Sequence, residues 1–179
     1  PVKLDERTEA LTKSPKNLGN TSMQKILIIG GGYAGFYTAF KLEKHLTPGE
    51  AEVTIVDPLP YMTYQPFLPE VVAGSIEARH TVVSHRRHLK KTNIVIGKMT
   101  KIDHASKKAT IALSGAGETV LDYDHVVVTA GAVSRTFPIP GVADNAIGLK
   151  TVEEAIEIRN RILTNFDKAA NLPAGPERD

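Results

Sequence analysis

The sequence predicts a three-layer α/β fold with a parallel sheet, helices on one side and a small antiparallel β-meander on the other. Lys25–Gly30 and His125–Ala130 are apolar, β-branched runs, which are typical of strands buried on both faces. A helical pattern over Ala34–Leu46 separates the first run from Glu52–Val56, so these segments predict a strand–helix–strand unit. Three strand-like segments typical of a meander lie at 94–102, 107–113 and 119–121.

The remaining segments predict less regular structure and one long helix. Leu59–Gly74 is rich in proline and aromatic residues and has no period, so we expect an ordered loop with one helical turn. Ser84–Lys91 predicts a short basic helix. Glu153–Lys168 predicts a longer helix with an apolar face, and Thr151 with Glu154 fits a capping box at its start.

Composition excludes several classes of protein. The chain has 179 residues, 41% hydrophobic and 23% charged, which is ordinary for about one globular domain. It contains no cysteine, so disulfides, thiolate metal sites and thiol nucleophiles are excluded. The formal net charge of +2 does not indicate a nucleic-acid-binding protein. No apolar run approaches the roughly 20 residues needed to span a bilayer.

The chain divides into three parts. Residues 1–22 are polar, mixed in charge and without an apolar signal segment, so we expect a disordered extension or a remnant of the expression vector. Residues 23–170 hold the folded pattern. Residues 171–179 contain Pro173, Gly175 and Pro176, which predict a linker toward a further domain that lies outside this chain.

The loop after the first strand carries the most informative motif. Gly30–Gly35 fits G-x-G-x-x-G, with Tyr33 and Ala34 between the second and third glycines of the motif. In this pattern the first glycine makes a tight turn, the second allows a pyrophosphate to approach, and the third lets the helix pack on the strand. The phosphates then bind main-chain N–H groups at the helix N-terminus. Asp57 ends the second strand, where a carboxylate can accept hydrogen bonds from ribose hydroxyls.

A glycine-rich turn with a surface aspartate is the alternative. Strand, motif, helix and acidic strand end are all in register, so we interpret the region as a Rossmann-like site for an adenine dinucleotide. Asp57 disfavours a 2′-phosphate on the ribose, because two negative charges would meet. These residue types alone leave open whether the dinucleotide is NAD or FAD.

Several blocks together resemble the FAD-binding N-terminal segment of type II NADH dehydrogenase. This enzyme is an NADH:quinone oxidoreductase of the pyridine nucleotide-disulfide oxidoreductase superfamily. The resemblance extends from about Gln24 to Lys168, and the blocks that carry it are IIGGGYAG (28–35), TYQPFLPEVVAG (63–74), IGKMTKID (96–103), YDHVVVTAG (123–131) and LKTVEEAIEIRNRI (149–162).

The resemblance implies FAD as the cofactor. It would place Gly30, Gly32 and Gly35 at the pyrophosphate and Asp57 at the ribose. The backbone near Met99 would border the adenine, and Gln65 with Pro66 would lie near the flavin ring. The segment formed by Thr129, Ala130 and Gly131 would pass close to the flavin.

The resemblance also implies an activity and partners. The parent enzyme would transfer a hydride from NADH to FAD and then reduce a quinone by two electrons, and the portion in this chain would be inactive alone. Homodimer formation and a cytoplasmic location with peripheral contact to the inner face of the plasma membrane are further expectations. Relatives carry a second glycine motif and a late G-D block, which this chain lacks.

Two other functions remain as alternatives: a different FAD-dependent reductase, such as a ferredoxin-type enzyme, and a non-catalytic dinucleotide-binding module. We assign no acid–base catalyst and no metal site. His80, His85 and His88 lie near four basic residues, but no carboxylate is in register with them. We interpret this segment as a solvated basic face.

Overall fold

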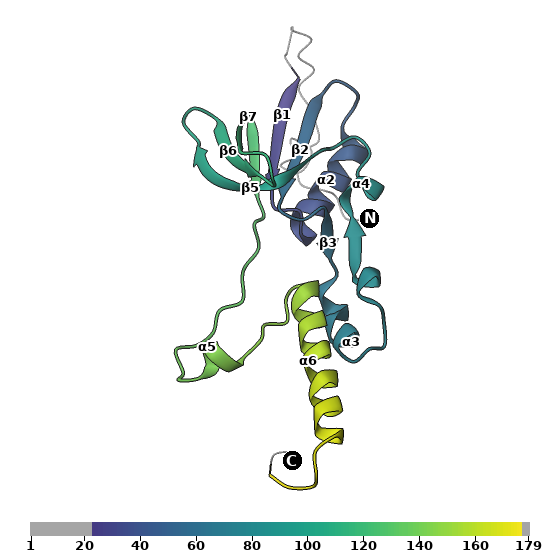
Figure 1. Cartoon of the computed structure of the whole chain (residues 1–179). Helices are drawn as coiled ribbons and strands as arrows, with labels where there is room; N and C mark the ends of the chain where they lie inside the picture. The colour runs from purple at the N-terminus through teal and green to yellow at the C-terminus, as the bar shows by residue number, and fades with distance from the viewer. Residues whose placement is uncertain (1–22, 177–179) are drawn as a thin grey trace, which may run out of the picture.

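A computed structural model of the chain describes residues 23–176 and shows the predicted strand–helix–strand order (Figure 1). In chain order, its elements are β1 (Gln24–Ile29), α2 (Tyr33–His45), β2 (Ala51–Asp57), β3 (Tyr61–Thr63), the 3-10 turn η1 (Gln65–Phe67), α3 (Leu68–Val72), the 3-10 turn η2 (Ala78–Thr81), β4 (Val82–Ser84), α4 (His85–His88), β5 (Asn93–Asp103), β6 (Lys108–Leu113), β7 (Glu118–Asp122), β8 (His125–Val128), α5 (Val142–Asn145) and α6 (Val152–Ala170). The extension predicted at 1–22 and the end of the predicted linker, 177–179, lie outside these residues.

The centre of the fold is a six-stranded sheet in the order β7-β6-β5-β2-β1-β8. Strand β1 pairs in parallel with β2 and β8, and β2 pairs in parallel with the first part of β5. The second part of β5 pairs antiparallel with β6, which in turn pairs with β7. The strand pattern at 94–102 predicts only a meander strand, but β5 belongs to both the parallel sheet and the meander.

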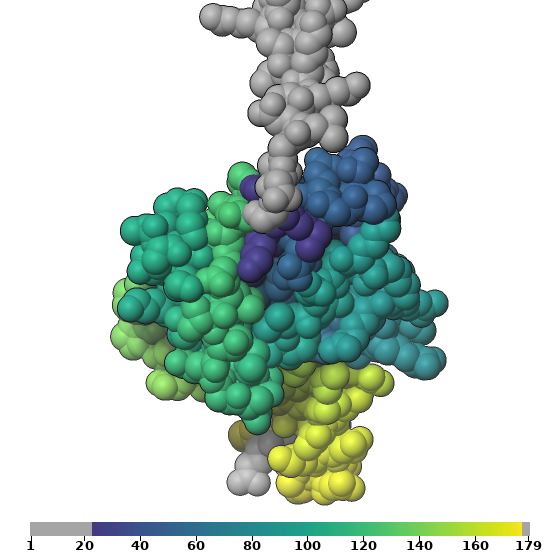
Figure 2. Space-filling view, turned by 90° about the horizontal axis from the view of Figure 1, so that it is seen from above, coloured from purple at the N-terminus to yellow at the C-terminus, as the bar shows by residue number. Residues whose placement is uncertain are grey.

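Two cores lie on opposite faces of the sheet because side chains alternate along β1. Ile28 packs with Phe36 of α2 on one face, whereas Leu27 and Ile29 pack with Tyr123 on the meander side. Seen from above, the green meander and the blue-to-teal region, which follows β1 in the chain, lie on either side of the purple β1 (Figure 2). The predicted three-layer fold, with helices and meander on opposite sides of the sheet, is confirmed.

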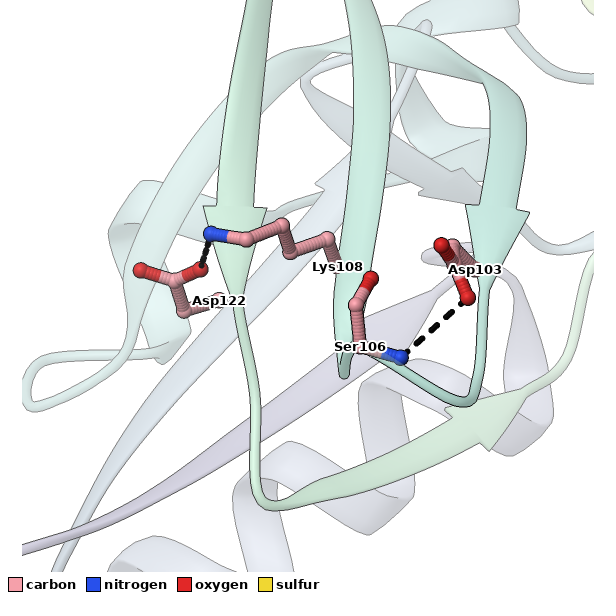
Figure 3. Close-up of polar contacts among 4 residues, drawn as sticks. All are labelled: Asp103, Ser106, Lys108 and Asp122. Atoms are coloured by element: carbon pink, nitrogen blue, oxygen red, sulfur yellow. Dashed lines mark hydrogen bonds and ion pairs between the residues drawn. The ribbon is translucent and has the colours of Figure 1, made fainter.

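Two polar contacts lie at the outer edge of the meander (Figure 3). Lys108 donates to Asp122 at 2.6 Å between β6 and β7, and the Ser106 N–H donates to Asp103 at 3.2 Å. The bond and charge of Lys108 lower the pKa of Asp122, and the Ser106 N–H lowers the pKa of Asp103. These carboxylates are exposed, so the contacts stabilise the fold little. Buried apolar side chains such as Ile111 hold the meander to the sheet.

The segment predicted to be an ordered loop with one helical turn, Leu59–Gly74, contains more regular structure than expected. It forms β3, η1 and α3, and β3 pairs antiparallel with β4 in a separate small sheet. Three-residue strands are too short to show a period, and this pairing depends on contacts between distant segments. The basic helix predicted over Ser84–Lys91 is only the short α4, since the chain is extended in β4 up to Ser84.

Helix α6 begins with the predicted capping box. Thr151 accepts from the Glu154 N–H at 3.2 Å, and Glu154 accepts from the Thr151 N–H at 2.9 Å. Its first turns pack on α3, and Ala155 is fully buried there. The rest of its predicted apolar face is open, since Phe166 is 69% exposed. Figure 1 shows α6 extending past α3, away from the sheet.

Glu43 of α2 links this helix to the chain before β5. Its carboxylate accepts hydrogen bonds from the Thr92 hydroxyl at 2.7 Å and from the N–H groups of Lys90 and Lys91 at 3.1 and 2.8 Å. Burial raises the pKa of Glu43, but these bonds outweigh it and leave the pKa below the ordinary 4.5.

We expect Glu43→Ala to lower the free energy of unfolding by about 1–3 kcal/mol at neutral pH, because three donors lose their acceptor. The folded-state pKa is lowered, so this stabilisation is present above the unfolded pKa and disappears as the pH falls through the folded one. Urea denaturation at neutral and acidic pH measures the difference, with exposed Glu157→Ala as the control. A difference between wild type and Glu43→Ala that stays constant as the pH falls would contradict this linkage.

Candidate functional site

The end of β1 and the start of α2 are packed so closely that neighbouring backbone leaves no room for a side chain on Gly30 or Gly35. Gly30 has a φ of 102°, and a Cβ there would overlap the backbone of Thr129. A Cβ on Gly35 would overlap the carbonyl oxygen of Gly30. Thr129 completes the contact by donating from its hydroxyl to the Gly30 carbonyl at 2.9 Å. These residues therefore join β1, α2 and the end of β8.

Gly32 is different, because nothing among the described residues requires a glycine there. Its φ of −68° suits any residue, and no atom lies within 4 Å of an added Cβ. That Cβ would instead occupy the cavity that Gly32 lines. The missing side chain leaves the space that a phosphate group needs to approach the backbone, so the residues present fit a dinucleotide.

A cavity of about 670 Å³ lies at the carboxyl ends of β1, β2 and β8, within the range for small-molecule and cofactor sites. Nine of the residues predicted for the site line it: Gly30, Gly32, Tyr33, Ala34, Asp57, Gln65, Thr129, Ala130 and Gly131. The structure therefore brings together four segments of the chain that are far apart in the sequence.

Three residues predicted for the site, Gly35, Pro66 and Met99, do not line this cavity. Gly35 is buried in the contact between α2 and β1, so its place in the motif is explained by packing. Met99 lies on β5, and its side chain packs against the core on the meander side of the sheet. The part that its backbone plays at the adenine stays a prediction.

Tyr61 and nine residues that sequence reasoning missed also line the cavity. These nine are Leu59, Met62, Thr63, Ala132, Val133, Ser134, Lys150, Thr151 and Glu154. The last three lie at the start of α6, and the capping box was the signal that marked this helix end. No sequence pattern connects it to the glycine loop, because the proximity arises only in the folded chain.

Asp57 already has two partners within the protein. One carboxylate oxygen accepts from the Gly31 N–H at 2.6 Å, and the other accepts from the Leu59 N–H at 2.7 Å. Each oxygen of a carboxylate has two lone pairs, so both retain capacity for a ribose hydroxyl. Asp57 therefore holds the glycine loop in place and presents an acceptor to the cavity.

Asp57→Ala is expected to weaken FAD binding by about 1–3 kcal/mol, because the ribose loses an acceptor and the loop loses a support. The matched Asp57→Asn variant retains one acceptor oxygen and should lose less. Titration of the chain with FAD, followed by flavin fluorescence, measures both. Affinity equal to that of the wild type in Asp57→Ala would identify Asp57 as a surface carboxylate without a part in binding.

Side chains from β3, η1 and the start of α6 form one wall of the cavity. The Gln65 amide donates to the Lys150 carbonyl at 3.3 Å, and the Tyr61 hydroxyl donates to Glu153 at 3.2 Å. Burial and the Glu153 carboxylate raise the pKa of Tyr61, so its phenol stays protonated. Tyr33 contacts Tyr64 with ring centroids 5.9 Å apart, which extends an aromatic surface outward from the cavity.

Other features of the described residues do not build a site. A hollow of about 720 Å³ is lined only by side chains of α6, so it is the open face of a single helix. Between residues 23 and 176, no three His, Cys, Asp or Glu side chains gather closely enough to hold a metal ion. Of the three clustered histidines, only His85 is buried, and it lies behind the glycine loop.

A glycine loop between a parallel strand and a helix, facing a cavity at the carboxyl ends of the strands, defines a dinucleotide-binding α/β domain. The family model described as pyridine nucleotide-disulphide oxidoreductase matches residues 24–170. The chain belongs to this family. The predictions of an oxidoreductase domain and of FAD as its cofactor are thereby confirmed.

Individual relatives agree with this assignment. The chain is 38% identical over 160 residues to the mitochondrial external alternative NAD(P)H-ubiquinone oxidoreductase B2 of Arabidopsis thaliana, covering 84% of the chain and 27% of that protein. It is 35% identical over 158 residues to the type II NADH:quinone oxidoreductase of Staphylococcus aureus, covering 87% of the chain and 37% of that protein.

A solved structure shows the same fold. NDH2 from Plasmodium falciparum, in complex with NADH, superposes with a TM-score of 0.77 and 26% identity, covering 87% of this chain and 32% of that one. The chain therefore spans between 27% and 37% of the length of these relatives.

Proposed function

We propose that this chain is the FAD-binding portion of an NADH:quinone oxidoreductase. The observation that carries the proposal is the open side of Gly32, which faces a cavity at the carboxyl ends of three parallel strands. The names of the two relatives, each an NAD(P)H or NADH oxidoreductase acting on a quinone, support the choice of substrates.

Each site residue has a proposed part. The diphosphate of FAD lies against the Gly30–Gly35 loop at the N-terminus of α2, where main-chain N–H groups and the helix dipole favour an anion. Asp57 accepts from the ribose, and the backbone at Met99 borders the adenine. Gln65 and the Thr129–Gly131 segment lie beside the flavin.

FAD, when bound, supplies the redox chemistry by accepting a hydride and passing on two electrons. The side chains of this portion bind and orient it. The whole protein then oxidises NADH and reduces a quinone, whereas the 179-residue chain alone does not complete a cycle. Steady-state assays of the whole protein with a soluble quinone and with ferredoxin test this, and a preference for ferredoxin would move the assignment to a ferredoxin-type reductase.

The visible absorption spectrum of the purified chain is the most direct test of cofactor binding. A flavin spectrum, with FAD and not FMN released on heating, supports the proposal. A colourless chain that becomes yellow on addition of FAD supports it with weaker binding. A chain that binds NADH but not FAD would identify a nicotinamide-binding module instead.

We also propose a cytoplasmic location with peripheral contact to the inner face of the plasma membrane, and a homodimer. Within residues 23–176, no helix is both long and apolar enough to cross a bilayer. The exposed basic side chains of Arg86, Arg87, Lys90 and Lys91 support attraction to anionic headgroups. Cosedimentation of the whole protein with anionic and neutral vesicles tests the contact, and sedimentation velocity tests the dimer.

A further inference from the structure

His85, the first residue of α4, is buried directly behind the glycine loop. Its side chain is 0% exposed, and its Nε2 lies 2.8 Å from the carbonyl oxygen of Gly31. The ring stacks on Phe36 with centroids 6.1 Å apart, so its orientation is fixed. His85 does not line the cavity, and any effect on a ligand there must act through the loop.

The contact selects one tautomer of the imidazole. A carbonyl oxygen only accepts hydrogen bonds, so Nε2 must carry the hydrogen and donate it to Gly31. Nδ1 has no hydrogen-bond partner among the described residues, so in the neutral imidazole it is the nitrogen without the hydrogen. The imidazole is therefore a buried donor aimed at a single peptide unit.

Gly31, the second residue of the motif, is explained by this contact. The motif allows any residue at this position. A Cβ on Gly31 would overlap the His85 ring and come within 3.1 Å of the Asp57 Cβ. Gly31 therefore lets the imidazole approach the loop at a point that does not line the cavity, and the two residues act as a pair.

Two hydrogen bonds fix the peptide units on either side of Gly31. Asp57 accepts from the Gly31 N–H, and His85 donates to the Gly31 carbonyl. That carbonyl and the Gly32 N–H belong to one planar trans peptide, so they point in opposite directions. With the carbonyl held toward His85, the Gly32 N–H points away from the imidazole, and Gly32 itself lines the cavity. A peptide between two glycines meets little steric resistance to flipping, so the histidine decides its orientation.

We propose that His85 is a positioning residue for the diphosphate: it holds the Gly31–Gly32 peptide so that the Gly32 N–H donates to a phosphate oxygen. The proposal rests on the proposed dinucleotide binding and extends it to a residue outside the cavity. Without the donor, the peptide is free to turn its carbonyl toward the phosphate. The Gly31 carbonyl oxygen would then repel the phosphate oxygens, because both carry negative charge.

Three variants test this role in the 179-residue chain. His85→Leu removes the donor at similar volume, and His85→Gln keeps an amide donor that reaches as far as Nε2. His88→Leu is the matched control, since His88 is an exposed residue of α4 that also contacts Phe36. Affinities for FAD, ADP and adenosine are measured by calorimetry and by ligand NMR titration, and circular dichroism monitors the fold.

We expect His85→Leu to bind FAD and ADP about 10-fold or more weakly, with adenosine unchanged, because only the phosphate contact is lost. His85→Gln and His88→Leu should stay close to wild type. Wild-type FAD affinity in His85→Leu would overturn the role, and so would an equal loss for adenosine or a failure of folded His85→Gln to restore binding. If the wild type binds neither FAD nor ADP, the proposed function itself fails.

A second measurement avoids the risk that His85→Leu does not fold. Long-range ¹H–¹⁵N spectra of the wild-type chain report which imidazole nitrogen carries the hydrogen. The expected result is an Nε2–H tautomer for His85. An Nδ1–H tautomer would leave the Gly31 carbonyl without this donor and would overturn the positioning role.

Discussion

Gly32→Val is expected to weaken FAD binding by roughly 100-fold or more while the chain remains folded. Apart from its chain neighbours, no residue between 23 and 176 has an atom within 4 Å of the added Cβ, so we expect the new side chain to fill the space proposed for the diphosphate without displacing packed groups. Valine is a poorer N-cap than glycine, and we expect this to cost about 1 kcal/mol or less of stability. Titration with FAD and thermal denaturation measure the two effects separately.

Gly32→Ala provides the graded control, with an intermediate loss of affinity for a smaller side chain. Retention of wild-type affinity in Gly32→Val would show that no phosphate group lies against this part of the loop. Loss of the folded state would also contradict the expectation, since it would mean that Gly32 serves packing.

Gly35→Val is expected to have the opposite outcome and to destabilise the fold by about 3 kcal/mol or more. A Cβ at this position meets the Gly30 carbonyl, which is backbone and cannot move away, and also the Thr129 hydroxyl at 2.8 Å. The start of α2 would then have to separate from β1. Urea denaturation of the chain without cofactor measures this cost directly.

Comparison of the two glycines makes the prediction specific. Adding a large excess of FAD should stabilise wild type more than Gly32→Val, because only a bound ligand shifts the folding equilibrium. Gly35→Val should already be less stable before any ligand is added. Equal stability of Gly35→Val and wild type would refute the close packing that the structure shows between α2 and β1.

The sequence predicted the central layers because local patterns define them. The apolar runs of β1 and β8, the helical spacing of α2 and the capping residues Thr151 and Glu154 are all visible within short windows. The hydrophobic period and the capping residues depend only on residues that are close in sequence. The helices and strands that they predict are therefore found in the structure.

The parts that sequence reasoning missed depend on contacts between distant residues. His85 contacts Gly31 across 54 positions, and Gln65 contacts Lys150 across 85. The tight spacing of His85 and His88 suggested only a solvated basic face, yet one of these side chains is fully buried. The glycine motif identified the loop but gave no indication that the His85 side chain contacts its backbone.

The pairing of β1 with β8 has a consequence for the order in which the protein is made. Gly30 meets Thr129 across 99 positions, so the glycine loop obtains its final shape only after β8 joins the sheet. During synthesis, the ribosome must therefore release the chain beyond residue 129 before the loop takes this shape, and beyond residue 154 before the cavity is complete. The cofactor site is therefore completed late in synthesis. FAD then stabilises a sheet in which β1 and β8, which are far apart in the sequence, have already paired.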